Sequence, residues 1–154
     1  MTVVAIALGS NLGDRVAHLN WAVEALAAHV VDMRVSGFVD TEPVGVPDVQ
    51  PPYLNAALVG TTALGPDALL TLLLHLEAER GRQRRGHLAA RTLDLDLILY
   101  GAAVINRPGL VVPHPRFRER LFVLQPLAEV GTDLVDPVTG QSIAALLARR
   151  LAAL

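Results

Sequence analysis

An alternating run of leucines and polar residues near the middle of the chain constrains the fold most strongly. Over residues 91–100, leucine alternates with Asp94, Asp96, Ile98 and Tyr100. A period of two is that of a β-strand, in which successive side chains point to opposite faces of the sheet. The run therefore predicts a strand with a buried leucine face and, on the other face, two carboxylates whose Cα atoms lie roughly 6.6 Å apart.

Two carboxylates at this spacing can converge on one divalent cation or on a pair of cations about 4 Å apart. The alternative interpretation is an edge strand with two solvated acids, which is commoner for an isolated Asp-x-Asp. The preceding residues, 80–91, favour the metal interpretation because they are crowded with arginine. Guanidinium groups bind phosphate oxygens in a bidentate manner, so acids and arginines together predict a metal-bound polyphosphate.

Composition sets limits on the class of protein. A chain of 154 residues predicts one domain, residues 1–154. The net charge of −2 provides no general attraction to nucleic acid or to an anionic membrane. The chain contains no cysteine, its amino-terminal residues do not resemble a signal peptide, and its longest leucine-rich run is too short to span a bilayer. These features predict a cytoplasmic protein that does not bind membranes, and we expect a monomer.

The remaining periodicity predicts an α+β fold. Strands are expected at residues 3–8, 30–39, 53–59 and 91–100, with helices from Asp14 to Leu26 and from Pro66 to Gly81. This βαββαβ order predicts a ferredoxin-like core, an antiparallel sheet with helices packed on it. A hairpin around residues 104–112 and helices at 121–130 and 143–154 are expected to complete the core. Residues 41–52 and 82–90 are expected to be functional loops.

One histidine is expected to be functional. His114 lies between two prolines and directly before a basic segment that contains Arg116, Arg118 and Arg120. By contrast, His18 has no evident partner in the sequence and is expected to be structural or exposed. Without a lysine the chain has no phosphate-binding P-loop, so phosphate must be held by side chains from several segments. The residues expected to do so are Arg82, Arg84, Arg91, His114 and Arg120.

Several blocks in the chain match a known family in the same order. They are residues 7–14 (ALGSNLGD), 53–56 (YLNA), 77–82 (EAERGR), 91–96 (RTLDLD) and 112–115 (VPHP), followed by Arg120 and Phe122. Through these blocks the chain resembles the 6-hydroxymethyl-7,8-dihydropterin pyrophosphokinases of folate biosynthesis nearly end to end. The resemblance implies magnesium-dependent transfer of pyrophosphate from ATP to the hydroxymethyl group of the pterin, giving the pterin diphosphate and AMP.

The resemblance also implies a role for individual residues. Asp94 and Asp96 would bind two magnesium ions, and together with Arg82 and Arg91 they would form the catalytic group. The residues expected to bind ATP are Glu77, Arg82, Arg84, Arg91, Leu97, His114 and Arg120. The residues expected to bind the pterin are Thr41, Val44, Tyr53, Asn55 and Phe122, with the two aromatic rings on either side of the heterocycle. The loops at 41–52 and 82–90 resemble the mobile lids of the family.

Two positions depart from the family pattern. Members often have Trp-Gly-Pro immediately before the lid arginine, whereas Leu88, Ala89 and Ala90 precede Arg91 here. Leu74 stands where members often have glutamine. We therefore expect retained activity with altered lid closure. The alternatives are a non-catalytic ferredoxin-like module that binds RNA or a small anion, and a glycosyltransferase that uses Asp-x-Asp, for which the chain is short.

Overall fold

The computed structural model describes residues 1–41, 52–81 and 92–154. The strands are β1 (Thr2–Ser10), β2 (Val30–Val35), β3 (Val39–Thr41), β4 (Tyr53–Thr62), β5 (Asp94–Tyr100), β6 (Ile105–Arg107) and β7 (Leu110–Val112). The helices are α1 (Arg15–Leu26), α2 (Pro66–Glu79), α3 (Leu121–Gly131), α4 (Ile143–Ala152) and a short 3-10 helix, η1 (Phe117–Glu119).

An antiparallel sheet forms the centre of the molecule. Its long strands are ordered β2-β4-β1-β5, and β3 pairs with β4 beyond the end of β2. Strands β6 and β7 form a separate hairpin. The predicted α+β class, with helices on an antiparallel sheet followed by a hairpin and two helices, is confirmed.

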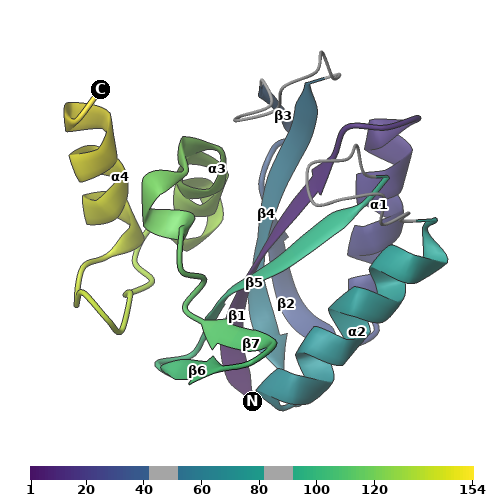
Figure 1. The fold of residues 1–154 in the computed structure, drawn as a ribbon, viewed down its shortest axis with the longest axis horizontal. Coiled ribbons are helices and arrows are strands. Elements are labelled where there is room, and N and C mark those ends of the chain that lie inside the picture. The colour runs from purple at the N-terminus through teal and green to yellow at the C-terminus, as the bar shows by residue number, and fades with distance from the viewer. Residues whose placement is uncertain (42–51, 82–91) are drawn as a thin grey trace.

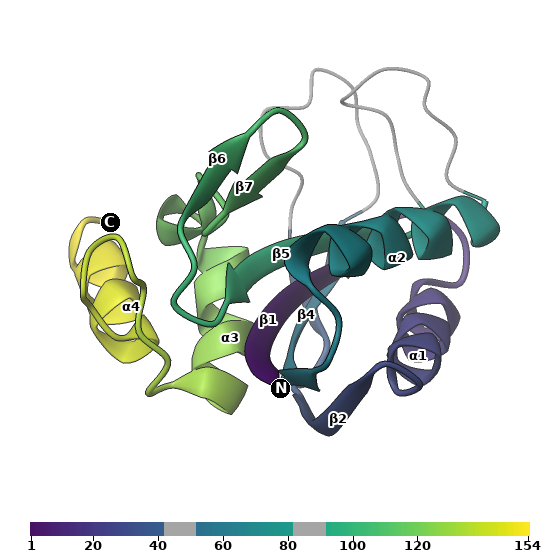
Figure 2. The same cartoon turned by 90° about the horizontal axis from the view of Figure 1, so that it is seen from below.

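Helices cover both faces of this sheet (Figures 1 and 2). Helices α1 and α2 pack on one face, where leucines from α1, α2, β1, β4 and β5 form a first core cluster. Helix α3 packs on the other face against a second cluster that includes Ala57, Ile98 and Phe117, and α4 packs outside α3. None of the helices in the described ranges is long and apolar enough to cross a membrane.

Local sequence signals set the helix ends as expected. The Asp14 carboxylate accepts a hydrogen bond from the Ala17 N–H (3.1 Å) and caps α1. Helix α2 begins at Pro66, whose fixed φ suits a first helical position. Gly81 follows α2 with a φ of +86°, in the left-handed region that glycine adopts without a steric cost.

The single strand predicted over residues 30–39 is wrong. Ser36 interrupts it: its backbone N–H donates to the Ala57 carbonyl and its Oγ accepts from the Ala57 N–H, both at 2.9 Å. The segment therefore divides into β2 and β3, and β3 pairs Thr41 with Tyr53. A hydroxyl that takes part in a strand ladder changes the local geometry without changing the apolar pattern.

The leucine alternation in β5 also ends earlier than predicted. Ala5 pairs with Leu99 whereas Ile6 pairs with Leu97, so β5 has one extra residue, a β-bulge, at Ile98. As a result Leu99 joins Ile98 in the second core cluster, while Leu93, Leu95 and Leu97 remain in the first. The bulge lies after Asp96, so the predicted orientation of the two acids holds.

Candidate active site

The candidate site is built on one face of three neighbouring strands. Gly9 on β1 pairs with Asn55 on β4 and with Asp94 on β5. Directly paired residues in an antiparallel ladder project to the same face, and so do residues two apart on one strand. Tyr53, Asn55, Asp94 and Asp96 therefore share a face, which is the face that α3 covers further along.

Gly9, at the centre of this row, lets its neighbours' side chains come close to the backbone. A Cβ atom on Gly9 would lie 3.3 Å from Asn55 Oδ1 and 3.5 Å from Tyr53 Cδ1. Both side chains thus converge on a position without a side chain of its own. A flat group can approach the backbone at such a glycine more closely than it could at any other residue.

The pterin residues predicted on β3 and β4 are held together by polar contacts. Asn55 Nδ2 donates a hydrogen bond to Thr41 Oγ1, and the Asn55 side chain is buried. Arg15 at the start of α1 donates from Nη1 to Asp40 Oδ1 (2.5 Å) and to the Pro52 carbonyl (2.7 Å). These bonds join the end of β3 to the beginning of β4, which brings Thr41, Tyr53 and Asn55 into one group.

The two acids of β5 are half-buried, and a residue of α2, on the opposite face of the sheet, holds the backbone between them. Glu77 on α2 is 2% exposed, and its Oε2 accepts a hydrogen bond from the Leu95 backbone N–H (2.8 Å). Leu95 lies between Asp94 and Asp96, so this bond sets the position of both. The ATP contact predicted for Glu77 stays a prediction.

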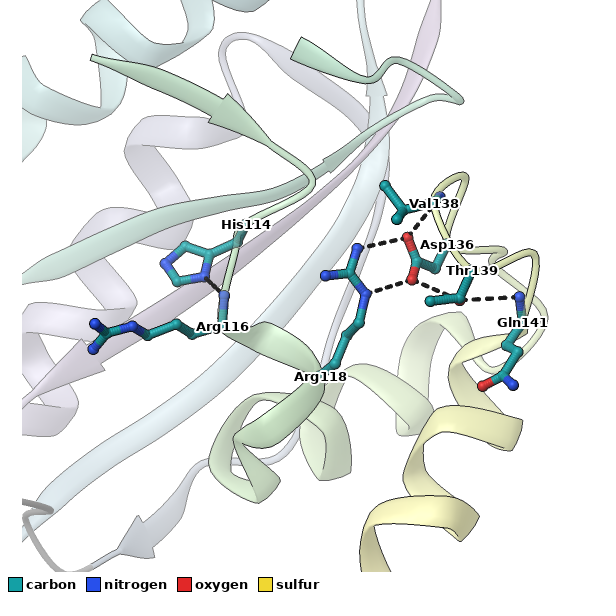
Figure 3. A network of polar contacts seen from close by, with 7 residues as sticks. All are labelled: His114, Arg116, Arg118, Asp136, Val138, Thr139 and Gln141. Atoms are coloured by element: carbon teal, nitrogen blue, oxygen red, sulfur yellow. Dashed lines mark hydrogen bonds and ion pairs between the residues drawn. The ribbon is translucent and has the colours of Figure 1, made fainter. Parts of the chain in front are cut away.

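His114 joins the hairpin to the edge of β5. Its backbone N–H donates to the Ile98 carbonyl (3.0 Å), and its Nδ1 accepts from the Arg116 N–H (3.1 Å; Figure 3). Burial, reinforced by Arg120 and Arg116 and partly offset by Asp94, lowers the pKa of His114 to about 4. At neutral pH the ring is therefore uncharged, and because Nδ1 is an acceptor the proton resides on Nε2.

Arg120 brings the predicted nucleotide and pterin residues together. Its guanidinium lies over the Phe122 ring, 5.5 Å from the ring centroid, and Phe122 packs against the second core cluster. This contact is a cation–π interaction. The charge expected to bind phosphate and the ring expected to stack on the pterin thus form one unit at the start of α3.

Some predicted site residues are placed differently or lie outside the description. The Leu97 side chain is buried in the first core cluster, so an ATP contact at this position would involve its backbone. Val44, Arg82, Arg84 and Arg91 lie outside the described residues. The departures at 88–90 and nearly all of the two predicted lids also lie outside them.

Within residues 1–41, 52–81 and 92–154, no three His, Asp or Glu side chains gather closely enough to hold a metal ion. A cation at Asp94 and Asp96 would need further oxygen ligands from phosphate or water, which is the usual arrangement for magnesium. A pocket of about 260 Å³ lies elsewhere, at the opposite end of β1 and β5, where Val3, Leu99 and Asp133 contribute to its lining.

Long-range contacts of three basic or histidine residues were missed in the sequence. His18 does have a partner: Arg80 Nε donates to its Nδ1 (2.8 Å), and burial with the nearby Arg80 charge lowers the pKa of His18. The Arg15 contacts described above were not expected either. The Arg118 side chain points away from the other arginines of the basic segment and binds Asp136. No local spacing signals such pairs, because their partners are 18 to 62 residues away.

An antiparallel α+β fold that presents two acids beside a histidine and arginines is suited to an enzyme that transfers phosphoryl or pyrophosphoryl groups. Residues 5–132 match the sequence model of the 7,8-dihydro-6-hydroxymethylpterin-pyrophosphokinase family. The chain belongs to this family, and the identification made from the sequence blocks is confirmed.

Curated relatives agree with this assignment. The chain is 46% identical over 130 residues to the 2-amino-4-hydroxy-6-hydroxymethyldihydropteridine pyrophosphokinase of Bacillus subtilis, covering 83% of this chain and 77% of the relative. It is 42% identical to that of Methylorubrum extorquens, covering 97% and 94%. The folic acid synthesis protein of Pneumocystis carinii is 41% identical over 92% of this chain, which spans only 19% of that protein. The predicted pyrophosphokinase activity in folate synthesis agrees with these names.

Solved structures support the fold. A Plasmodium falciparum HPPK-DHPS structure superimposes with a TM-score of 0.80 over 98% of this chain at 13% identity. The wild-type protein of the same organism gives a TM-score of 0.78 at 12% identity. This chain spans 44% and 45% of those chains, so the likeness concerns one part of each.

Proposed function

We propose that this chain transfers pyrophosphate from ATP to the hydroxymethyl group of 6-hydroxymethyl-7,8-dihydropterin with the help of magnesium. The observation that carries the proposal is the row Asn55-Gly9-Asp94 across β4, β1 and β5. Two strand spacings separate the outer members, about 10 Å. That separation allows a heterocycle read by Asn55 to lie beside a phosphate chain bound near Asp94.

Asp94 and Asp96 are proposed to bind magnesium, with two ions when ATP is present. Both acids are half-buried on the same face, and Glu77 holds the strand between them. Bound magnesium neutralises phosphate oxygens and so lowers the barrier to attack on the β-phosphorus of ATP. The protein's share is to hold the two carboxylates at a fixed spacing, with the remaining ligands supplied by ATP and water.

Neutral His114 is proposed to donate from Nε2 to a phosphate oxygen, and Arg120 to supply positive charge beside it. Arg82, Arg84 and Arg91 are proposed to complete the charge neutralisation, with Arg82 and Arg91 acting in catalysis. Glu77 and the backbone at Leu97 are proposed to border the nucleotide. Fixed donors of this kind favour a transition state with charge spread over the transferred group.

The pterin is proposed to lie between Tyr53 and Phe122. Two facing aromatic rings bury both sides of a flat heterocycle. Asn55, held by Thr41, would form hydrogen bonds with the edge of the pterin, with backbone groups near Thr41 and Val44 alongside. In this arrangement the hydroxymethyl group points along the row toward Asp94.

We further propose that residues 1–154 form one ferredoxin-like pyrophosphokinase domain that acts as a cytoplasmic monomer. The strand order β2-β4-β1-β5, with α1 and α2 on one face, supports the ferredoxin-like topology. Light scattering at working concentration tests the monomer, since a dimer would double the mass.

Calorimetry followed by a turnover assay tests the function. A non-hydrolysable ATP analogue should bind only with magnesium, pterin should then bind, and ATP should be converted to AMP. Asp94→Asn should abolish turnover, whereas the control Asp133→Asn, at an exposed acid remote from the row, should not. Binding of RNA or of inorganic phosphate without magnesium-dependent nucleotide binding would instead support the anion-binding module.

A further inference from the structure

The middle arginine of the basic segment 116–120 does not face the site. Figure 3 shows His114 and Arg116 on one side of the η1 turn, while Arg118 extends away from them to Asp136. Arg118 Nε and Nη2 donate to the two oxygens of that carboxylate at 2.5 and 2.9 Å. The Arg118 guanidinium also lies over the ring of the buried Phe117, 4.8 Å from its centroid. Arg118 is thus an anchor for η1.

Asp136 is a fully buried and fully bonded acceptor. Its side chain is 0% exposed, and besides the two bonds from Arg118 it accepts one from Thr139 Oγ1 (2.7 Å) and one from the Val138 N–H (3.0 Å). Burial raises the pKa of Asp136, but the hydrogen bonds from Arg118, Thr139 and Val138 outweigh it and lower the pKa to about 2. A bidentate, charge-assisted pair of this kind has little freedom to rotate.

A second contact from the carboxyl-terminal part of the chain reaches the next residue of η1. Arg150 on α4 donates from Nε to the Glu119 carbonyl (2.9 Å). Two consecutive residues, Arg118 and Glu119, are therefore held by the segment after residue 132. That segment lies beyond the residues matched by the family model.

We propose that the Arg118–Asp136 pair, assisted by Arg150, positions His114, Arg116 and Arg120 for the nucleotide. This inference rests on the proposed function. A 3-10 helix of three residues has few hydrogen bonds of its own, so its orientation depends on what anchors it. The anchors act on one side of the turn, and the ring of His114 is bound to the backbone of Arg116 on the other. Arg120 directly follows the anchored residues.

The pair is a positioning device, so its loss should act on one substrate more than on the other. Asp136→Asn keeps the shape of the side chain but removes its charge. We expect the Kd of a non-hydrolysable ATP analogue to rise about tenfold, since small displacements of positioned charges are costly. The KM for pterin at saturating ATP should change less than about threefold, because Tyr53 and Asn55 belong to β4 and the Phe122 ring is held by its packing against the second core cluster. Arg118→Lys should behave like Asp136→Asn, and the double variant should be no worse than either alone.

Asp133→Asn is the matched control: the same change, three residues away, at an exposed position. It should leave both constants unchanged. An equal loss of both affinities, or a lower melting temperature with an unchanged Kd for the ATP analogue, would overturn the proposal. If Asp136→Asn does not fold, the same comparison of the Kd of the ATP analogue with the KM for pterin is made on Arg118→Lys and Arg150→Ala, and its outcome decides the proposal.

A nucleotide-free measurement separates this inference from the proposed function. In NMR spectra of the ligand-free protein at pH 7.5, Asp136→Asn should shift the side-chain resonances of His114 and Arg120, and Asp133→Asn should not. Unshifted resonances would overturn the positioning role even in an active enzyme. If the wild-type protein fails to bind the ATP analogue, the proposed function fails, while the NMR result still decides whether the pair orients these side chains.

Discussion

The two faces of the central sheet differ although the same strands build them. On the face covered by α1 and α2, Leu95 and Leu97 of β5 and Leu93 just before the strand are buried in a continuous apolar cluster. On the other face the same strand presents Asp94 and Asp96, both half-buried, in a row with Asn55. Because the side chains of a strand alternate between faces, the residues that stabilise the fold and the residues proposed for catalysis alternate along β5. Substitution of a leucine should therefore lower the unfolding free energy, whereas substitution of the neighbouring acid should lower turnover.

One residue connects the two faces. Glu77 reaches from α2, on the leucine side, to the backbone N–H between the two acids. A buried carboxylate is costly unless it is bonded, so its position beneath these two acids indicates a requirement for fixed strand geometry. The side chains of the two faces are therefore separate, but both sets depend on the position of the same β5 backbone.

The largest effect is expected on the acidic face. Asp96→Ala should lower turnover by a factor of at least about 10³, or roughly 4 kcal/mol, because magnesium would lose a ligand. The free energy of unfolding should change by about 1 kcal/mol or less, because Asp96 is half-buried and belongs to neither core cluster. Steady-state rates and urea denaturation measure the two quantities. A variant that keeps a tenth of the activity would show that Asp96 does not hold a metal ion that the reaction needs, and that the chemistry is not centred on the acidic face of β5.

The adjacent leucine should show the opposite behaviour. Leu95→Ala removes a buried side chain from the first cluster and should cost about 3 kcal/mol of unfolding free energy. The rate per folded molecule should stay within about threefold, because the backbone bond to Glu77 remains. Leu151→Ala, at a leucine that is 43% exposed on α4, is the control and should cost little. A stable but inactive Leu95→Ala protein would contradict the separation of the two faces.

The division of β5 into a leucine face and an acidic face could be predicted from the sequence because it depends on neighbouring residues. The alternation in β5, the Asp14 cap and the Pro66 start all arise from residues that are neighbours in the chain. The bulge at Ile98 could not be predicted, since it depends on how β5 registers with β1. The division at Ser36 depends in the same way on Ala57 in a later strand.

The candidate site was predictable to the extent that it lies in motifs. The alternation in β5 predicted that Asp94 and Asp96 share a face, the resemblance to the family assigned roles to Tyr53 and Asn55, and the structure brings all four to one face. Anchors such as Asp136 carry no motif. Their partners are distant in sequence, and only the folded chain shows that Arg118 binds Asp136 while Arg120 lies near His114.

A smaller effect is expected for the aromatic wall of the polar face. Tyr53→Ala should raise the KM for pterin about thirtyfold, or roughly 2 kcal/mol, through loss of ring stacking. The Kd of the ATP analogue should be unchanged. Tyr53→Phe, which keeps the ring, should stay near wild type. Equal losses in both substrates would mean that Tyr53 supports the sheet and does not contact the pterin.

The smallest effect concerns proton uptake on the polar face. The pKa of His114 is about 4 in the folded protein and about 6.5 when unfolded. As pH falls from 6.5 to 4, the unfolded chain binds a proton that the folded chain does not. The neutral His114 ring therefore costs no unfolding free energy above pH 6.5, and the folded protein loses stability as pH falls through that window. His114→Gln abolishes the effect. Between pH 7.5 and pH 4.5 the wild type should lose about 1 kcal/mol more unfolding free energy than the variant, as measured by urea denaturation. Equal losses of unfolding free energy in the wild type and the variant would show that the pKa of His114 is the same in the folded and unfolded protein. This part of the polar face would then lie open to water, and Arg116 and Arg120 would not be held close to the ring.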